Sequence, residues 1–528
     1  TLREAFDSLY SAGISCDVVF EIKPGIYNAQ YLLTEFSAVN DHTVTLQPQT
    51  GDSTDVILTT DSTDYLVNLQ GTRNIKFKGL TFTSDNAEVL FQISNRACNV
   101  QLEGNYFAGT TTTGYSVYSP QEANSVDTSI AIANNLFHGA AVAISLSSDG
   151  SEYERYNRIV SNQFIDQTEI SIDLQKQSEY VISNNQIENS TGKCSYVAAS
   201  QKGRFINNSI RIGEQYQETV RFQGNADTTI IANNFIQGEK LTMGAVNLSA
   251  DNLLFVFNTV VSNNNALNIY GSDNVVQNNI LISEPTGTAI AVGAFASNNI
   301  SDFNCLYSGE ENPLGMWNDV AYNTLEEWQS ASGLDANSLS VWPGFHSATD
   351  LHTHSLFIDG KGTPISEVSD DIDSEPRDPS SPDIGADEFT EKFSLEEDLT
   401  LCLEAAYEIH AGEGYDSYLW STGADSSYIV VDSTGIGHGS ETYSVTVILD
   451  GISYTDSVEV AFSSPLATLP SYYCAVAESD SVYLTAADGV SYEWSTGDST
   501  QSIWLSAGDA SVIVTDANGC QTTDHITR

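Results

Sequence analysis

Asp173 and Arg221 are the two charged residues with positions suited to chemistry in the first part of the chain. Each lies in a short run that alternates apolar and polar residues, "EISIDL" and "TVRFQG". A polysaccharide lyase needs an Arg or Lys as base, and a glycoside hydrolase needs two or three carboxylates. A pair of this kind supports either chemistry only as an alternative, because isolated charges on a strand more often form a solvated face.

An acidic run before residue 390 is the best candidate for cation binding, since carboxylates are the ligands that calcium prefers. It lacks the order of an EF-hand loop, and the structural alternative is that Arg377 pairs with one of the acids and fixes the segment. The candidate ligands for a structural calcium ion are Asp370, Asp371, Asp373 and Asp383, within a run that also contains Glu375, Asp378, Asp387 and Glu388.

Other possible metal sites have weaker patterns. His352 and His354 have metal-like spacing in "DLHTHS", but two histidines alone are weak evidence. The seven cysteines include no C-x-x-C pair, so we expect no zinc site. The string "GIGHGS" at 435–440 contains the Gly-His-Gly of polygalacturonases, but its partner motifs are absent and we interpret it as chance.

The charge balance excludes several classes of partner. The chain has 528 residues with 70 Asp and Glu against 19 Lys and Arg, a formal net charge of -51. Such a surface repels nucleic acid and anionic lipid. No apolar run reaches the roughly 18 residues that a membrane-spanning helix needs, and no secretory leader opens the chain. We expect a segment of a longer, exported protein.

Asparagines recur with a period in the twenties, inside motifs such as "ANNLF", "ANNFI" and "QNNIL". A repeat of this length with short alternating strands predicts a solenoid in which the strands of each turn pair with the equivalent strands of the turn before. Asparagine suits its corners because it tolerates a left-handed backbone and its amide can stack in a ladder. The predicted corner residues are Asn105, Asn135, Asn162, Asn185, Asn208, Asn234, Asn258 and Asn279, followed by Asn299.

The alternation predicts which side chains face outward on one strand of each turn. Only Asp173 and Arg221 are charged among them, two turns apart or about 10 Å at the spacing of paired strands. No carboxylate cluster forms in this register. The predicted outward residues are Ala143, Ser145, Ser171, Asp173, Ala198, Arg221, Asn247, Asn268 and Ala291.

The chain resembles the right-handed parallel β-helix, or pectin-lyase-like, superfamily over about residues 1–390. The corner asparagines, "FNCLY" at 303–307 and the closing "DIGADEF" before residue 390 carry the resemblance. "TLREAFDSLY" places Leu2, Ala5, Phe6 and Leu9 on one helical face, which predicts a capping helix over the first turn. The expected fold is therefore all-β, with a β-helix over 1–392.

Two small modules are expected after the solenoid, at 393–463 and 464–528. Each has short strands around one tryptophan, Trp420 or Trp494, the pattern of a small β-sandwich with that ring in its core. Cys474 and Cys520 bracket the second module, which predicts a disulfide between them, and Cys402 would then be free. Both modules resemble immunoglobulin-like or PKD-like repeats of type IX-secreted bacterial proteins, which implies display on a bacterial cell surface.

The uncharged strand face and the tandem modules favour a non-catalytic extracellular protein, such as an adhesin, stalk or filament component. Its partners would be a polysaccharide or further copies of itself. The alternative is a secreted polysaccharide-active enzyme, or a carbohydrate-binding protein without turnover. Exposed aromatics would mark the last of these, and Tyr115, Tyr118 and Tyr153 are the candidates.

Overall fold

The structure is a computed structural model in which the chain divides into two compact units, residues 1–390 and 391–528. Each unit is described by itself. The described residues are 2–12, 14–36, 42–109, 114–121, 126–148, 152–189, 192–213, 218–239, 244–309, 312–353, 355–389, 393–403, 405–412, 414–449, 452–466, 468–470, 472–473, 481–506 and 508–528.

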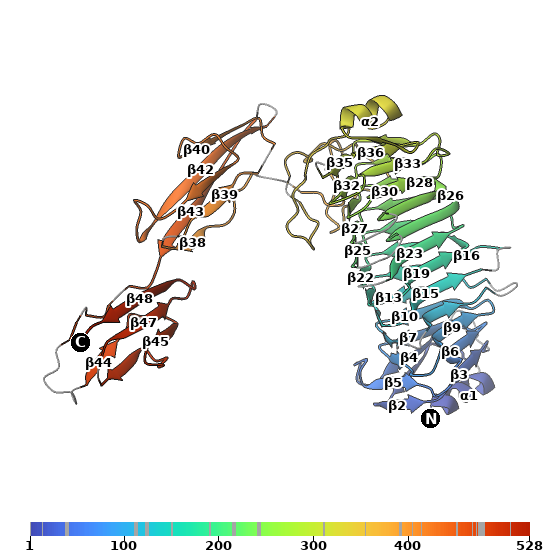
Figure 1. Cartoon of the computed structure of the whole chain (residues 1–528). Helices are drawn as coiled ribbons and strands as arrows, with labels where there is room; N and C mark the ends of the chain where they lie inside the picture. Colours follow the sequence, from blue (N-terminus) through green and yellow to red (C-terminus); the bar gives the residue numbers. More distant parts are fainter. Residues whose placement is uncertain are drawn as a thin grey trace. The chain divides into compact units, whose positions relative to one another are not determined.

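The first unit is a parallel β-solenoid with three strands per turn, which stack into three faces (Figure 1). Face A contains β1 (Val18–Ile22), β4 (Val44–Pro48), β7 (Arg73–Lys78), β10 (Cys98–Glu103), β13 (Ala131–Ala133), β17 (Arg158–Val160), β21 (Val181–Ser183), β24 (Arg204–Ile206), the second parts of β26 (Val220–Ala232) and β28 (Val246–Val256), β31 (Val275–Gln277) and β34 (Ile300–Asp302). Because β26 and β28 continue around a bend, they belong to two faces.

Face B is a sheet of 12 strands among the described residues, one from each turn. It contains β2 (Gly25–Asn28), β5 (Val56–Thr59), β8 (Thr81–Thr83), β11 (Tyr106–Ala108), β14 (Leu136–His138), β18 (Gln163–Ile165), β22 (Gln186–Asn189), β25 (Ser209–Ile212), β27 (Phe235–Gly238), β29 (Thr259–Ser262), β32 (Ile280–Ser283) and β35 (Cys305–Ser308).

Face C contains β3 (Tyr31–Thr34), β6 (Tyr65–Gln70), β9 (Val89–Ser94), β12 (Tyr115–Ser119), β15 (Val142–Ser147), β19 (Ile170–Gln175), β23 (Lys193–Ala198), the first parts of β26 and β28, β30 (Leu267–Ile269), β33 (Ile290–Val292) and β36 (Gly315–Trp317). The short strands β16 (Glu154–Arg155) and β20 (Gln177–Ser178) pair beside it, and β37 (Val320–Tyr322) pairs antiparallel with β36.

The interior of the solenoid is a column of identical or similar side chains, because parallel in-register strands place equivalent residues above one another. On face B, the rings of Phe82, Phe107, Phe137 and Phe164 stack with centroids 4.9, 4.8 and 5.0 Å apart. These distances match the spacing of hydrogen-bonded strands. Each ring is fully buried, so one apolar position per turn builds a continuous core.

The corners that connect face A to face B explain why pairs of asparagines recur in the sequence. The first residue of the corner has a left-handed backbone, with φ of 56° at Asn134 and at Asn207, which asparagine tolerates better than most residues. The second residue is buried, and its side-chain amide bonds to the amide of the next turn. Asn135 Nδ2 donates to Asn162 Oδ1 at 3.0 Å, and Asn208 Nδ2 donates to Asn234 Oδ1 at 3.0 Å.

All eight predicted corner residues, Asn105 to Asn279, lie in this ladder of amides. The next member is Asn304, since Asn279 Nδ2 donates to Asn304 Oδ1 at 3.0 Å. The assignment of Asn299 to the ladder is therefore wrong. Asn299 stacks instead on Asn274 at another corner, where its Oδ1 accepts from the backbone of Asn274 at 2.9 Å.

Two helices cover the ends of the core (Figure 1). The amphipathic α1 (Leu2–Ala12) buries Phe6 and Leu9 against the first turns, as the sequence predicted. At the other end, Thr324 caps α2 (Leu325–Ser332), which buries Trp328 against the last turn. Neither helix, in the part of the chain that the structure describes, is long and apolar enough to cross a membrane.

Residues 341–389 form a closing segment that covers the outside of face B and its corner with face A. Ile358 and Ile384 pack on Ile280 and Ile282, while Val368 packs beside Phe257. This burial explains why residues on the outer side of β29 and β32 are apolar.

Arg377 fixes the closing segment to the ladder corner, as the structural alternative for the acidic run predicted. Its side chain is 3% exposed and pairs with Glu388 at 3.2 Å. It also donates to Asn233 Oδ1 at 2.9 Å and lies 4.0 Å from the ring centre of Phe257. A buried cation with several partners is expensive to disrupt.

The second unit contains two small β modules: module 1 (393–463) and module 2 (464–528). Module 1 contains β38 (Leu399–Cys402), β39 (Tyr407–His410), β40 (Ser417–Trp420), β41 (Tyr428–Val431), β42 (Gly439–Leu449) and β43 (Ile452–Ser463), and module 2 contains β44 (Val482–Thr485), β45 (Ser491–Trp494), β46 (Ser502–Leu505), β47 (Ala510–Thr515) and β48 (Gln521–Ile526).

Trp420 and Trp494 occupy equivalent core positions in the two modules. Each ring is 2% exposed, and each indole N–H donates to a backbone carbonyl six residues later, that of Ser426 or Thr500, at 2.8 Å. The shared hydrogen bond identifies the two modules as copies of one plan.

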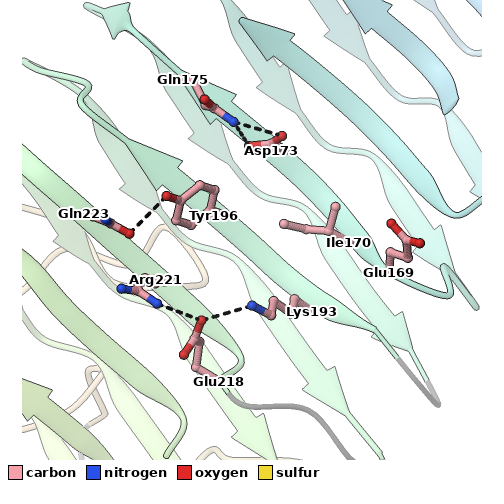
Figure 2. A pocket seen from close by; sticks show the side chains of 9 residues that line it. All are labelled: Glu169, Ile170, Asp173, Gln175, Lys193, Tyr196, Glu218, Arg221 and Gln223. Carbon is pink, nitrogen blue, oxygen red and sulfur yellow. Dashed lines mark hydrogen bonds and ion pairs between the residues drawn. The ribbon is translucent and has the colours of Figure 1, made fainter. Parts of the chain in front are cut away.

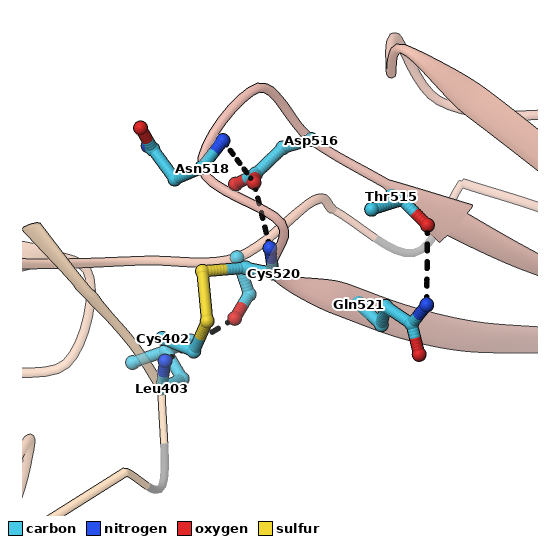
Figure 3. The surroundings of a disulfide bond; sticks show 8 residues. Cys402, Leu403, Thr515, Asp516, Asn518, Cys520 and Gln521 are labelled. Atoms are coloured by element: carbon cyan, nitrogen blue, oxygen red, sulfur yellow. Dashed lines mark hydrogen bonds between the residues drawn. A yellow bond between two sulfur atoms is a disulfide. The ribbon is translucent and has the colours of Figure 1, made fainter. Parts of the chain in front are cut away.

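The predicted Cys474–Cys520 disulfide is wrong. Cys520 is bonded to Cys402, 118 residues away, and the bond joins module 1 to module 2 (Figure 3). Cys402 is therefore not free, and Cys474 lies outside the described residues. The prediction assumed that a disulfide closes one module, whereas this bond closes the pair.

Candidate functional site

One lateral row of side chains runs across face C, at positions that the strand register aligns. Asp173 of β19 aligns with Tyr196 of β23, which aligns with Arg221 of β26. The row also contains Tyr118, Ser145, Asn247, Asn268 and Ala291. Asp173 and Arg221 are thus two turns apart, at the separation that the sequence indicated.

Three of the predicted outward residues lie elsewhere. Ala143 and Ser171 are fully buried, and Ala198 belongs to the neighbouring row, where it aligns with Gln175 and Gln223. Tyr196 takes the place that the sequence gave to Ala198. Both face outward two residues apart on one strand, so the alternation could not distinguish them.

A pocket of about 480 Å³ opens on this face, a size in the range of small-molecule and sugar sites. Figure 2 shows its side chains, which come from three successive turns of face C, those of β19, β23 and β26, and from the residues that precede two of these strands. We call it the cation pocket, and it is lined by Glu169, Ile170, Asp173, Gln175, Lys193, Tyr196, Glu218, Arg221 and Gln223.

Two cations reach one carboxylate in the cation pocket. Lys193 Nζ lies 3.1 Å from Glu218 Oε1, and Arg221 lies 3.6 Å from the same oxygen (Figure 2). Glu218 is 1% exposed, whereas the two cations are 27% and 28% exposed. The carboxylate therefore supports the cations from beneath while their outer surfaces remain open to a ligand.

The ion pairs leave hydrogen-bonding capacity unused among the described residues. Glu218 Oε2 and Arg221 Nε are buried and have no partner there. Unpaired buried polar atoms are uncommon in folded proteins and cost free energy. Here both atoms belong to the ion pairs that the pocket contains.

Asp173 has the environment of a proton donor. Burial raises the pKa of its carboxyl group, and the hydrogen bonds from Gln175 and Ser145 oppose that rise. Gln175 Nε2 donates to Asp173 Oδ1 at 3.2 Å, and Ser145 Oγ donates to Oδ2 at 3.4 Å. A raised pKa favours the neutral acid, which can donate a proton to a leaving oxygen.

Tyr196 lies between the acid and the cations. Its register position is one turn from both Asp173 and Arg221, and its hydroxyl donates to Gln223 Oε1 at 3.0 Å (Figure 2). A phenol held in this way can exchange a proton with a bound sugar.

The three tyrosines that the sequence named are half-buried. Tyr115 and Tyr118 of β12 stack with ring centres 4.3 Å apart, and the charge of Asp173 contributes to the raised pKa of Tyr115, after burial and Tyr118. Tyr118 lies in the same lateral row as Asp173, two turns before it. Tyr153 lies under the ammonium of Lys176, 5.7 Å from its ring centre.

The four predicted cation ligands do not converge among the described residues. Asp371 accepts backbone hydrogen bonds from Asp373 and Glu388, and Asp383 accepts them from Gly360 and Phe389. Hydrogen bonds of this kind stabilise the turns of the closing segment. Asp370 contributes its backbone carbonyl, which accepts from the side chain of Asn233 at 2.6 Å.

Asp373 alone of the four joins a group of possible metal ligands. Atoms of Asp373, His352 and Asp387 lie within 4.8 Å of one another. Hydrogen bonds to Asp350 and Asp373 raise the pKa of His352 against the effect of burial, and burial raises the pKa of Asp387 to about 6. His354, the other predicted metal residue, lies outside the described residues, and the segment "GIGHGS" is a largely exposed turn of module 1 that leads into β42.

Lys193, Tyr196 and Glu218 were missed by the sequence interpretation. Lys193 is the first residue of its strand and Glu218 precedes one, so neither belongs to an alternating run. A signal did exist, because the chain has only 19 Lys and Arg, and Lys193 and Arg221 lie within three positions of each other in the register of successive turns.

Comparisons with known proteins find similar solved structures but no matching family. No protein-family model matches the chain, and no curated protein matches it. Among solved structures, the chain is similar to the PL6 family alginate lyase AlyGC, with a TM-score of 0.40 and 13% sequence identity over 76% of this chain. The chain spans 60% of the length of that lyase.

The prediction of a non-catalytic adhesin, stalk or filament component is corrected. It depended on a strand face without a charged cluster, whereas the cation pocket contains three carboxylic acids and two cations. This arrangement favours the alternative that the sequence allowed, a polysaccharide-active protein.

Proposed function

We propose that the chain is an enzyme that cleaves an acidic, uronate-containing polysaccharide by β-elimination at the cation pocket. One observation supports this above the others: Lys193 and Arg221 converge on Glu218 in the pocket that also holds the half-buried acid Asp173. In a chain with a formal charge of -51, paired cations at an open pocket attract an anionic group that the rest of the surface repels.

The two cations supply the binding of a uronate carboxylate. Arg221 has five N–H donors, and its side chain is 28% exposed. Lys193 adds a second positive charge at the same place. Cations held against the substrate carboxylate also stabilise the negative charge that develops next to it when the neighbouring C5 proton is removed.

Tyr196 and Asp173 have positions suited to the two proton transfers. Tyr196 acts as the phenolate, formed when its own proton is lost to solvent, and takes the C5 proton; the C4–O4 bond breaks, and a C4=C5 double bond forms. The departing O4 takes the proton of Asp173, whose raised pKa keeps that proton available. Tyr118, in the same lateral row as Asp173 and stacked on Tyr115, provides an apolar surface for the adjoining sugar.

Hydrolysis is the second candidate, because Asp173 and Glu218 are two carboxyl groups in one pocket. A glycoside hydrolase needs one carboxylic acid and one carboxylate on either side of the bond. Glu218 Oε1 is occupied by two cations, which favours elimination.

The test is product release from the full chain with polygalacturonate, alginate and neutral polysaccharides, read as unsaturated sugars and as reducing ends. We expect unsaturated ends from an acidic polymer, and loss of turnover in R221A. R211A is the matched control, since Arg211 lies on face B and pairs with Glu188 and Glu239. Reducing ends alone would indicate hydrolysis. Silence across the panel, with no binding of an acidic polymer, would overturn the proposal.

We also propose export to a bacterial cell surface, with modules 1 and 2 as immunoglobulin-like or PKD-like spacers of a type IX-secreted protein. The Cys402–Cys520 disulfide supports an oxidising compartment, and the acidic composition suits an exposed surface. Localisation of the parent protein by fractionation of cells tests this. Retention in the cytoplasm would overturn it.

Structural calcium in the closing segment remains a proposal, and Asp373 is the predicted ligand with the best position for it. His352 beside it offers nitrogen, which zinc accepts more readily than calcium does. Thermal unfolding with calcium, with zinc and with chelator distinguishes these ions. An unfolding temperature that none of them changes would overturn cation binding here.

A further inference from the structure

Module 2 presents two aromatic side chains to solvent on one face of its two-stranded sheet. Tyr483 of β44 and Trp504 of β46 are directly opposite each other in the antiparallel register. Their ring centres are 5.0 Å apart, and the rings are tilted by 49°. Tyr483 is 56% exposed and Trp504 is 68% exposed. The next cross-strand pair on the same face is Thr485 and Ser502, whose hydroxyls bond at 2.9 Å.

Module 1 shows that the fold does not require these rings. Its equivalent strands β39 and β41 place Glu408 opposite Val430. Val430 follows the core Trp420 by ten residues, as Trp504 follows Trp494. The equivalence is confirmed by burial, since Ile429 and Ile503 both point into their cores. Module 2 therefore carries an exposed tryptophan where its copy carries a small aliphatic residue.

A large exposed aromatic surface with polar neighbours indicates binding more often than stability. The apolar C–H face of a pyranose ring packs well on an indole or a phenol, and its hydroxyls can reach the hydroxyl groups beside them. Two rings 5.0 Å apart offer room for adjoining sugars of one chain.

The negative charge of the second unit indicates which kind of polysaccharide its exposed rings could bind. Residues 391–528 contain 22 acidic and only two basic side chains, Lys392 and Arg528. An acidic polysaccharide is repelled by such a surface, in contrast to the cation pocket of the first unit. The rings therefore suit an uncharged polymer.

We propose that Tyr483 and Trp504 form a binding platform for a neutral polysaccharide, distinct from the cation pocket. The platform would hold the protein on an uncharged matrix polymer while the pocket acts on an acidic one. This inference does not depend on the cleavage that we propose for the first unit.

The experiment is affinity electrophoresis of the full chain in gels that contain xylan, mixed-linkage β-glucan or galactomannan. We expect retardation in at least one gel, and a roughly tenfold weaker affinity for W504A and Y483A. W504F should keep most of the binding, because it preserves an aromatic face. V430A, at the equivalent position of module 1, is the matched control. R221A tests whether the cation pocket contributes to this binding. Neither variant should change the retardation.

Three outcomes would overturn the platform. One is that no neutral polymer retards the wild-type chain. Another is that W504A binds as well as wild type while its thermal unfolding temperature falls, which would make the pair a structural cross-strand contact. The third is retention only by a polycation such as chitosan, with loss in W504A, which would assign the rings to a cationic ligand.

Discussion

Asp173 and Arg221 lie in one lateral row of face C, with Tyr196 of the intervening turn between them. Strand register alone fixes this order, because a parallel solenoid places equivalent residues of successive turns at a spacing of about 4.8 Å. An acid, a phenol and a guanidinium thereby span about 10 Å along the solenoid axis, a length comparable to two sugar units.

D173N should lower kcat on an acidic polysaccharide by roughly 10²- to 10⁴-fold, the usual contribution of a general acid. Burial raises the pKa of Asp173, so the protonated form that donates to O4 is lost as the pH rises through that value. The wild-type rate should therefore fall at high pH, and D173N should lack this limb. D85N, at an exposed acid elsewhere on the solenoid, is the control. A D173N enzyme with an unchanged pH profile would contradict the assignment.

Glu154 should make the solenoid less stable as the pH rises. Glu154 and Asp127 are both fully buried, and the hydroxyl of Ser119 lies within hydrogen-bond distance of both carboxyl groups. Burial, and after it the charge of Asp127, raises the pKa of Glu154 to about 8. The folded state thus binds a proton that the unfolded state releases above about 4.5. Its contribution to stability is complete below that pH, and is lost as the pH rises through about 8, by on the order of 1.4 kcal/mol per pH unit.

E154Q tests this pH dependence, since an amide keeps the shape of the protonated acid. Thermal unfolding from pH 5 to pH 9 should show a smaller decline for E154Q than for wild type. Parallel curves for the two proteins would show that Glu154 does not titrate in this range.

Asn208 in the middle of the ladder should be intolerant of substitution. Its Nδ2 donates to Asn234 Oδ1 at 3.0 Å and to the carbonyl of Ile182 at 3.1 Å, and its Oδ1 accepts from the Asn185 side chain at 3.0 Å. N208A leaves these buried groups unpaired, at about 1–3 kcal/mol each. Chemical denaturation should show a loss of several kcal/mol, against almost none for N28A at an exposed strand end. A loss below about 1 kcal/mol for N208A would mean that the ladder contributes little.

Reduction of the Cys402–Cys520 disulfide should destabilise the second unit and leave the solenoid unaffected. A bond that closes a loop of 118 residues restricts the unfolded chain by about 4–5 kcal/mol in the chain-entropy account. Calorimetry should show one transition that moves to lower temperature with reductant and another that does not. The C402A/C520A double variant should no longer respond to reductant, and a response there would exclude the disulfide as the cause.

The sequence was sufficient for the solenoid because the same physical requirement recurs at every turn. Each A-to-B corner needs a residue that tolerates positive φ followed by a buried amide, and eight copies made the pattern visible. It failed at Asn299, where a second stack of asparagines has almost the same local sequence as the first. Only the hydrogen-bond partners distinguish them.

The cation pocket was only half predictable. Asp173 and Arg221 were found because they lie inside alternating strands, whereas Glu218 lies just before one and its role depends on the side chains that reach it. The prediction of the disulfide failed for a similar reason. Spacing in the sequence suggested that Cys520 closes its own module, but the partner is decided by how the two modules pack within the second unit.

The asparagine ladder gives the solenoid a dipole along its axis. Every amide in it points the same way, with Nδ2 donating toward the C-terminal turn, so the small dipoles add along the axis. The positive end terminates on a carboxyl group, since Asn304 Nδ2 donates to Asp335 Oδ1 at 3.0 Å. Asp335 is buried and also accepts from the indole of Trp328 at 2.8 Å. Asp335, which holds the indole that covers the last turn, thus also accepts the final hydrogen bond of the stack.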